Sequence, residues 1–127
     1  MKITDKIDQI QNETDSWKRT LGFLSQENAN LKIRLAELLN TDHSADSFLE
    51  TAELYQNRFV QKDEIIKLME KDVFELDKLL LREVYEDGII LKDISFRQTK
   101  YRKEIKSLES AFSDLKLQFN TYVSELT

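Results

Sequence analysis

The stretch LSQENANLKIRLAELL, residues 24–39, places leucines seven residues apart at Leu24, Leu31 and Leu38. The alternating three- and four-residue spacing extends back towards the N-terminus. Its positions are Ile3, Ile7, Ile10, Thr14, Trp17, Leu21, Leu24, Asn28, Leu31, Leu35 and Leu38. A repeat of this length requires a helix that supercoils left-handedly around a neighbouring helix. Residues 3–40 are therefore predicted to form a coiled-coil helix.

Two further stretches repeat this spacing, one from Phe48 to Leu80 and one from Leu91 to Leu126. The polar, turn-forming segment NTDHSADS, residues 40–47, separates the first two stretches. The chain has no proline and only two glycines, too few turn formers for a strand-rich fold. We predict an all-α fold in a single domain: three long amphipathic helices, about 3–40, 48–87 and 89–126, in an antiparallel three-helix coiled-coil bundle.

The connection at Gly88 allows two architectures. Either Gly88 adopts a left-handed conformation just past a helix end and the chain turns back, or the helix continues through it as a long rod. The rod is an alternative because one glycine inside a helix costs only about 1 kcal/mol relative to alanine. We favour the turn, which gives helices of similar length. It also brings the acidic segment 48–88, with 6 basic and 11 acidic residues, against segment 89–127, with 7 basic and 5 acidic.

Asn28 interrupts the apolar stripe of the first helix. A buried amide lowers stability unless it meets another polar group. In a parallel dimer, that group would be Asn28 of the second chain. In an intramolecular bundle, it would be a polar stripe residue such as Lys62 or Gln98. Both alternatives stay open at the level of sequence.

The self-pairing alternative predicts a homodimer through the first helix. Glu13 and Glu27 would then lie opposite Lys18 and Lys32 of a parallel second chain, and both pairs have opposite signs. The residues that would carry this association are Ile7, Leu21, Leu24, Asn28, Leu31, Leu35 and Leu38.

The segment LSQENANLK resembles the zipper of basic-leucine-zipper transcription factors over about two heptads. In that family, a basic region precedes the zipper and enters the major groove of DNA. Residues 1–23 instead carry four basic and four acidic side chains. The resemblance therefore stops at the zipper and implies no DNA binding of that kind.

Large apolar residues also fall outside the stripes, at positions where a heptad helix is normally polar. A helix that is apolar on two faces is expected to lie between two neighbours. The second helix has a band of such residues, for which we predict a protein partner: Leu54, Val60, Leu68, Phe74 and Leu81. Phe23 and Ile33 in the first helix and Phe96 and Leu117 in the third are similar.

The sequence offers little for catalysis or metal binding. There is no cysteine, and His43 is the only histidine, so no nucleophile–base pair can be assembled from these residue types. No glycine-rich phosphate loop is present. We expect a protein that is not an enzyme and holds no metal or cofactor.

One basic run, KDISFRQTKYRKEIK at residues 92–106, contains the ingredients of a contact with nucleic acid or an anionic surface. The candidate anion-binding residues are Arg97, Lys100, Arg102, Lys103 and Lys106. The chain as a whole has a net charge of −5, and pairing with the acidic second helix would neutralise this run. Nucleic-acid binding is therefore the alternative function.

No run of residues approaches the roughly 18–20 apolar residues that cross a bilayer, and residues 1–15 lack the apolar core of a signal peptide. We expect a cytoplasmic protein without membrane insertion. The sequence predicts a non-enzymatic coiled-coil structural or adaptor protein. It would self-associate and bind a protein partner through apolar helix faces.

Overall fold

A computed structural model describes residues 3–41, 46–86 and 91–126, and the described residues contain three long helices and no strand. Helix α1 spans Ile3–Leu39, α2 spans Asp46–Glu86 and α3 spans Leu91–Leu126. The all-α prediction is confirmed. Its boundaries differ from the observed ones by two residues at most.

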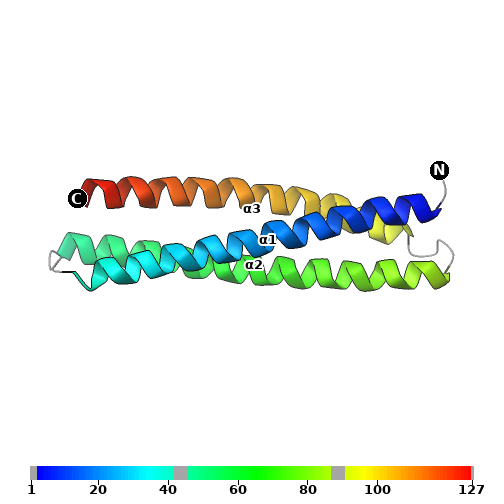
Figure 1. The fold of residues 1–127 in the computed structure, drawn as a ribbon, viewed down its shortest axis with the longest axis horizontal. Coiled ribbons are helices and arrows are strands. Elements are labelled where there is room, and N and C mark those ends of the chain that lie inside the picture. The colour runs from blue at the N-terminus through cyan, green and yellow to red at the C-terminus, as the bar shows by residue number, and fades with distance from the viewer. Residues whose placement is uncertain (1–2, 42–45, 87–90, 127) are drawn as a thin grey trace.

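The helices lie side by side in an elongated bundle and alternate in direction (Figure 1). Helix α2 runs antiparallel to α1 and α3, so α1 and α3 are parallel to each other. The start of α1 and the end of α3 therefore lie at opposite ends of the molecule. This is the predicted antiparallel three-helix bundle.

The alternative of a continuous rod is wrong, because α2 and α3 pack against each other. The rings of Phe59 in α2 and Phe119 in α3 lie 5.1 Å apart between centroids. In one straight helix these residues would be about 90 Å apart, at a rise of 1.5 Å per residue. Gly88 itself lies outside the described residues.

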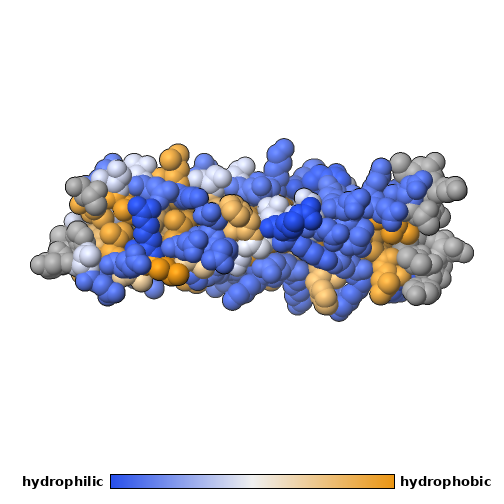
Figure 2. Space-filling model, in the orientation of Figure 1, coloured by the Kyte–Doolittle hydropathy of each residue, from blue (hydrophilic) through white to orange (hydrophobic). Residues whose placement is uncertain are grey.

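The three predicted stripes meet in one core. Every stripe residue whose side chain is described is buried or half-buried, including the polar Asn28, Lys62 and Gln98. Val123 is also buried, although it lies outside the predicted stripe of α3. The face of the molecule in Figure 2 is mainly hydrophilic, and its hydrophobic atoms gather towards the two ends.

Aromatic residues fill the core where α2 begins and α3 ends. Tyr55 lies 5.3 Å from Phe119 and 5.5 Å from Tyr122, measured between ring centroids. Phe48 stacks on Tyr122 at 6.4 Å. Each aromatic pair of this kind contributes about 0.5–1.5 kcal/mol beyond the burial of its area. These contacts hold α2 and α3 together at the end opposite their connection.

The flank of α1 that faces α2 carries basic groups. Lys18 forms an ion pair with Asp77, and Lys32 forms one with Asp63. Both lysines are two heptads apart on α1, as are the two aspartates on α2. The antiparallel register of α1 and α2 is therefore the same at both contacts.

The opposite flank of α1, which faces α3, carries acidic groups. Glu13 accepts two hydrogen bonds of 2.8 Å from Arg102, and Glu27 accepts one of 2.9 Å from Lys116. In both pairs the partners are 89 residues apart in sequence, so α1 and α3 keep one parallel register. The charges that were expected to pair between chains are thus all paired within one chain.

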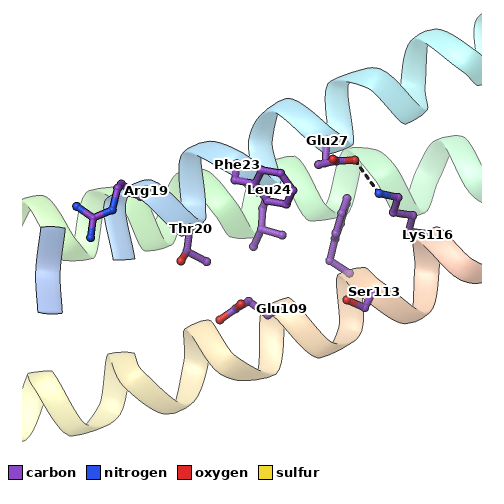
Figure 3. Close-up of a pocket in the computed structure, with 9 residues that line it drawn as sticks. Arg19, Thr20, Phe23, Leu24, Glu27, Glu109, Ser113 and Lys116 are labelled. Atoms are coloured by element: carbon purple, nitrogen blue, oxygen red, sulfur yellow. Dashed lines mark hydrogen bonds and ion pairs between the residues drawn. The ribbon is translucent and has the colours of Figure 1, made fainter. Parts of the chain in front are cut away.

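One position of this α1–α3 ladder lacks an ion pair. Thr20 lies midway between Glu13 and Glu27, and Glu109 lies midway between the two cations of α3. Thr20 and Glu109 point towards one another across the space between the helices (Figure 3). At this level a hydroxyl stands on α1, in the row of the ladder's carboxylates, and a carboxylate stands on α3, in the row of its cations.

Thr20→Lys is expected to complete the ladder and raise the free energy of unfolding by about 0.3–1 kcal/mol, the range of partly exposed ion pairs. Urea unfolding at low salt measures this gain. Thr20→Gln is the matched control, because it adds length without charge. Equal stability of the two variants, or a gain that survives Glu109→Gln, would contradict the assignment.

Candidate functional site

A polar layer crosses the core between α1 and α2. Asn28 is fully buried, with 0% of its surface exposed. Its Nδ2 donates hydrogen bonds to the backbone oxygen of Phe59 at 2.8 Å and to Oδ1 of Asp63 at 2.7 Å. The other Asp63 oxygen accepts from Lys32, one turn further along α1. The layer is therefore intramolecular, with Phe59 and Asp63 as partners rather than a second Asn28.

The two polar residues named as partners for Asn28 have other positions. Gln98 donates a hydrogen bond of 2.6 Å to Glu13 and so joins the α1–α3 ladder. Lys62 is half-buried and lines a groove between α2 and α3. Asp63, the actual partner, lies one residue past the α2 stripe. Charged residues are usual at that flanking position, so the sequence did not indicate that Asp63 would bond to the buried amide of Asn28.

The electrostatics of the layer favour an ionised Asp63. Burial alone would raise the pKa of Asp63, but the hydrogen bonds from Lys32 and Asn28 outweigh it and leave the pKa below its usual value. The layer is not fully satisfied, because Asn28 Oδ1 is buried without a hydrogen-bond partner. An unpaired buried oxygen costs stability, so the layer contributes register more than stability.

The seven residues predicted for self-association lie on the face of α1 that packs against α2 and α3. Five of them are buried apolar or amide side chains of the core, and Ile7 and Leu38 pack against it in part. Leu21 and Asn28 have no exposed surface. Within one chain this face packs inside the bundle, and its role in self-association stays a prediction.

The band predicted as a partner surface on α2 is exposed. Its five residues, Leu54, Val60, Leu68, Phe74 and Leu81, keep between 44% and 64% of their surface. Nζ of Lys78 lies 4.7 Å from the centre of the Phe74 ring, which leaves the rest of the ring open to solvent. Other exposed large apolar residues are Phe23, Ile33, Leu39, Leu49, Phe96 and Leu117. Leu39 and Leu49, at helix ends beside the α1–α2 connection, were not singled out from the sequence.

A groove of about 360 Å³ lies between α1 and α3 (Figure 3). Leu24 and Phe112 form its apolar floor, and the Glu27–Lys116 ion pair closes one end. Phe23 and Arg19 line it from α1 and Glu109 from α3. Sequence reasoning missed this groove, because its two walls are about ninety residues apart in the chain and only their parallel register brings them together.

The basic run of α3 is partly neutralised by its neighbours. Arg102 is paired with Glu13, and this hydrogen bond raises the pKa of Arg102 above its usual value. Arg97 contacts Asp93 at 3.3 Å, and Lys100 contacts Glu104 at 3.9 Å. The basic run thus pairs across the bundle with Glu13 of α1, whereas we expected it to pair with the acidic helix α2.

Lys103 and Lys106, the other two candidates for anion binding, are exposed and line different grooves. Lys103 borders the α2–α3 groove, and Lys106 borders a second groove between α1 and α3, beside Trp17 and Arg102. The run therefore does not present its five cations on one surface. The nucleic-acid alternative stays a prediction.

Within residues 3–41, 46–86 and 91–126, no helix is long and apolar enough to cross a bilayer, and no three His, Cys, Asp or Glu side chains are grouped as metal ligands. His43 lies outside the described residues. Comparison with protein-family models, with curated proteins and with solved structures finds no match to this chain. The geometry of the bundle is therefore what any assignment of function rests on.

Asn28→Asp is expected to lower the free energy of unfolding by about 3 kcal/mol or more at neutral pH. The substitution replaces a donor by an acceptor that faces the Phe59 carbonyl and the Asp63 carboxylate. Asn30→Asp, on the exposed side of the same helix, should change stability by about 0.5 kcal/mol at most. Adding Asp63→Asn should recover part of the loss, because donor and acceptor are then exchanged. An equal loss of stability in Asn28→Asp and Asn30→Asp would contradict the role given to the polar layer.

Acid should weaken the bundle through Asp63 and Glu13. Hydrogen bonds from Arg102 lower the pKa of Glu13, and the pKa of Asp63 is also lowered. Both carboxylates therefore stabilise the fold above their unfolded-state pKa of about 4, and this contribution is lost as the pH falls through the folded-state pKa. The variant Glu13→Gln with Asp63→Asn should be less stable at pH 7, by about 1 kcal/mol per site, with the difference shrinking towards pH 2.

Urea unfolding at several pH values measures this difference. Asp114→Asn, at an exposed carboxylate of α3, is the control and should follow the parent protein at every pH. A constant difference between the double variant and the parent from pH 7 to pH 2 would contradict the role given to the two carboxylates.

Proposed function

We propose that this protein is a non-enzymatic coiled-coil module, structural or adaptor in role, that self-associates and binds a protein partner through apolar residues on its outer faces. The observation that carries the proposal is the exposed apolar band of α2.

The apolar band of α2 is not needed to complete the core. The stripes of the three helices already enclose one another, and residues such as Leu21, Phe59, Leu76 and Phe119 have no exposed surface. Fully burying one Leu, Val or Phe side chain stabilises a protein by about 1.5–3 kcal/mol. In a single chain, the exposed apolar residues of α2 lack much of this stabilisation. Several such residues along one helix support the proposal that a partner covers them.

The shape of the bundle suits an extended contact. Helix α2 has 41 residues and is therefore about 60 Å long. Its exposed apolar residues recur from Leu54 to Leu81, with charged residues between them. An amphipathic helix laid along such a face can bury apolar side chains and pair charges at the same time.

A photo-crosslinking amino acid at position 74 tests the proposal in cells that express the protein. We expect covalent adducts from Phe74, because this ring would lie inside the contact, and none from the control position Gln26 on the exposed side of α1. Adducts of equal yield at both positions, or none at position 74, would contradict a binding role for the outer face of α2.

A further inference from the structure

We infer that the outer face of α2 binds the same face of a second copy of this chain, antiparallel and about a two-fold axis midway between Glu64 and Lys71. The inference rests on the proposed function, because it supplies a partner for the middle of the apolar band of α2, at Val60, Leu68 and Phe74. It is carried by the distribution of charge along this face.

Three rows of residues run along the outer face. The central row, directly opposite the core, is Asn57, Glu64, Lys71 and Lys78. The first flanking row is Val60, Lys67, Phe74 and Leu81, and the second is Leu54, Gln61, Leu68 and Glu75. At 3.5 residues per turn, each flanking row lies about 50° from the central row. All five residues of the exposed apolar band lie on the two flanking rows.

The charges of this face are divided between its two halves. The first half carries Glu50, Glu53 and Glu64, all exposed. The second half carries Lys71 and Lys78, and Lys67 lies at the axis between the halves; all three are exposed. Glu75 is the exception in the second half, and it contacts Lys78 at 3.5 Å. A surface that is acidic in one half and basic in the other is complementary to its own copy turned end to end.

Antiparallel pairing about the stated axis sets opposite charges against each other near the axis and, beside them, apolar residues against apolar residues. Glu64 of each copy meets Lys71 of the other in the central row. In the first flanking row, Val60 meets Phe74 of the other copy. In the second flanking row, Leu68 meets its own equivalent at the axis. Such an isologous contact repeats each pair twice, so one Glu64–Lys71 match gives two.

A parallel pairing in register has the opposite consequence. Glu64 would meet Glu64 and Lys71 would meet Lys71, and like charges across an interface are unfavourable. In the antiparallel arrangement, Lys67 is the one charged residue of these three rows that meets its own copy, and Glu64 of the second chain lies about one helical turn from it. The antiparallel geometry is therefore the one that the charges favour.

Sedimentation equilibrium of the purified protein at low salt tests the dimer and its register. We expect a reversible dimer with a Kd in the micromolar range, as for small interfaces. Glu64→Lys or Lys71→Glu alone should weaken the dimer at least about tenfold, because each creates two like-charged contacts. The double exchange should return the Kd to within about threefold of the parent. A monomer at all concentrations, or a double variant no better than the singles, would overturn the inference.

Disulfide crosslinking tests the same register independently, since the natural chain has no cysteine. Leu68→Cys should form a covalent dimer under mild oxidation much faster than Leu117→Cys, an exposed control on α3. Val60→Cys should crosslink to Phe74→Cys in a mixture and poorly to itself, because its own equivalent lies about 20 Å away along the helix. Equal rates for positions 68 and 117, or efficient self-crosslinking at position 60, would overturn the antiparallel register.

The two proposals fail in different ways. A monomeric protein whose position 74 still crosslinks to a different protein in cells would overturn the antiparallel dimer and the self-association, and would leave the proposed binding of a protein partner in place. A protein that neither dimerises nor forms adducts at position 74 would overturn both.

Discussion

Helix α1 packs one heptad stripe against two helices at once, and the rest of the bundle depends on this double contact. Its basic flank pairs with aspartates of α2 and its acidic flank with cations of α3. Since the two flanks differ in sign, exchanging α2 and α3 around α1 would set like charges against each other. The ion pairs are individually weak, so their effect is on arrangement more than on total stability.

The buried Asn28 acts on the same arrangement from inside the core. Its amide meets two acceptors of α2, and a shift of one turn between the helices would break the Asn28–Asp63 hydrogen bond. The unpaired Oδ1 shows that this layer is not optimised for stability. A polar group in an apolar stripe, which in a two-stranded coil would select a second chain, here selects a neighbouring helix of the same chain.

The proposed function rests on the apolar residues that lie outside the core. Because the three stripes enclose one another, the heptad leucines of α1 are used in folding, and the surface open to a partner is on the outer side of the bundle. On α2 that side combines apolar flanking rows with charges divided between its two halves. The proposed contact therefore uses a second set of heptad positions of α2, on the side of the helix opposite its core stripe.

The sequence by itself determined the helices, their approximate ends and the residues that face the core, because the 3.5-residue repeat is local and survives in any partner arrangement. It also identified the five residues of the exposed apolar band of α2. Only the tertiary structure decided which helices meet: that Asn28 bonds to Asp63, that Glu13 and Glu27 pair with α3, and that a groove forms between α1 and α3. The physical reason is that a heptad stripe with charged flanks fits a helix of its own chain as well as one of another. The choice depends on contacts between residues far apart in sequence.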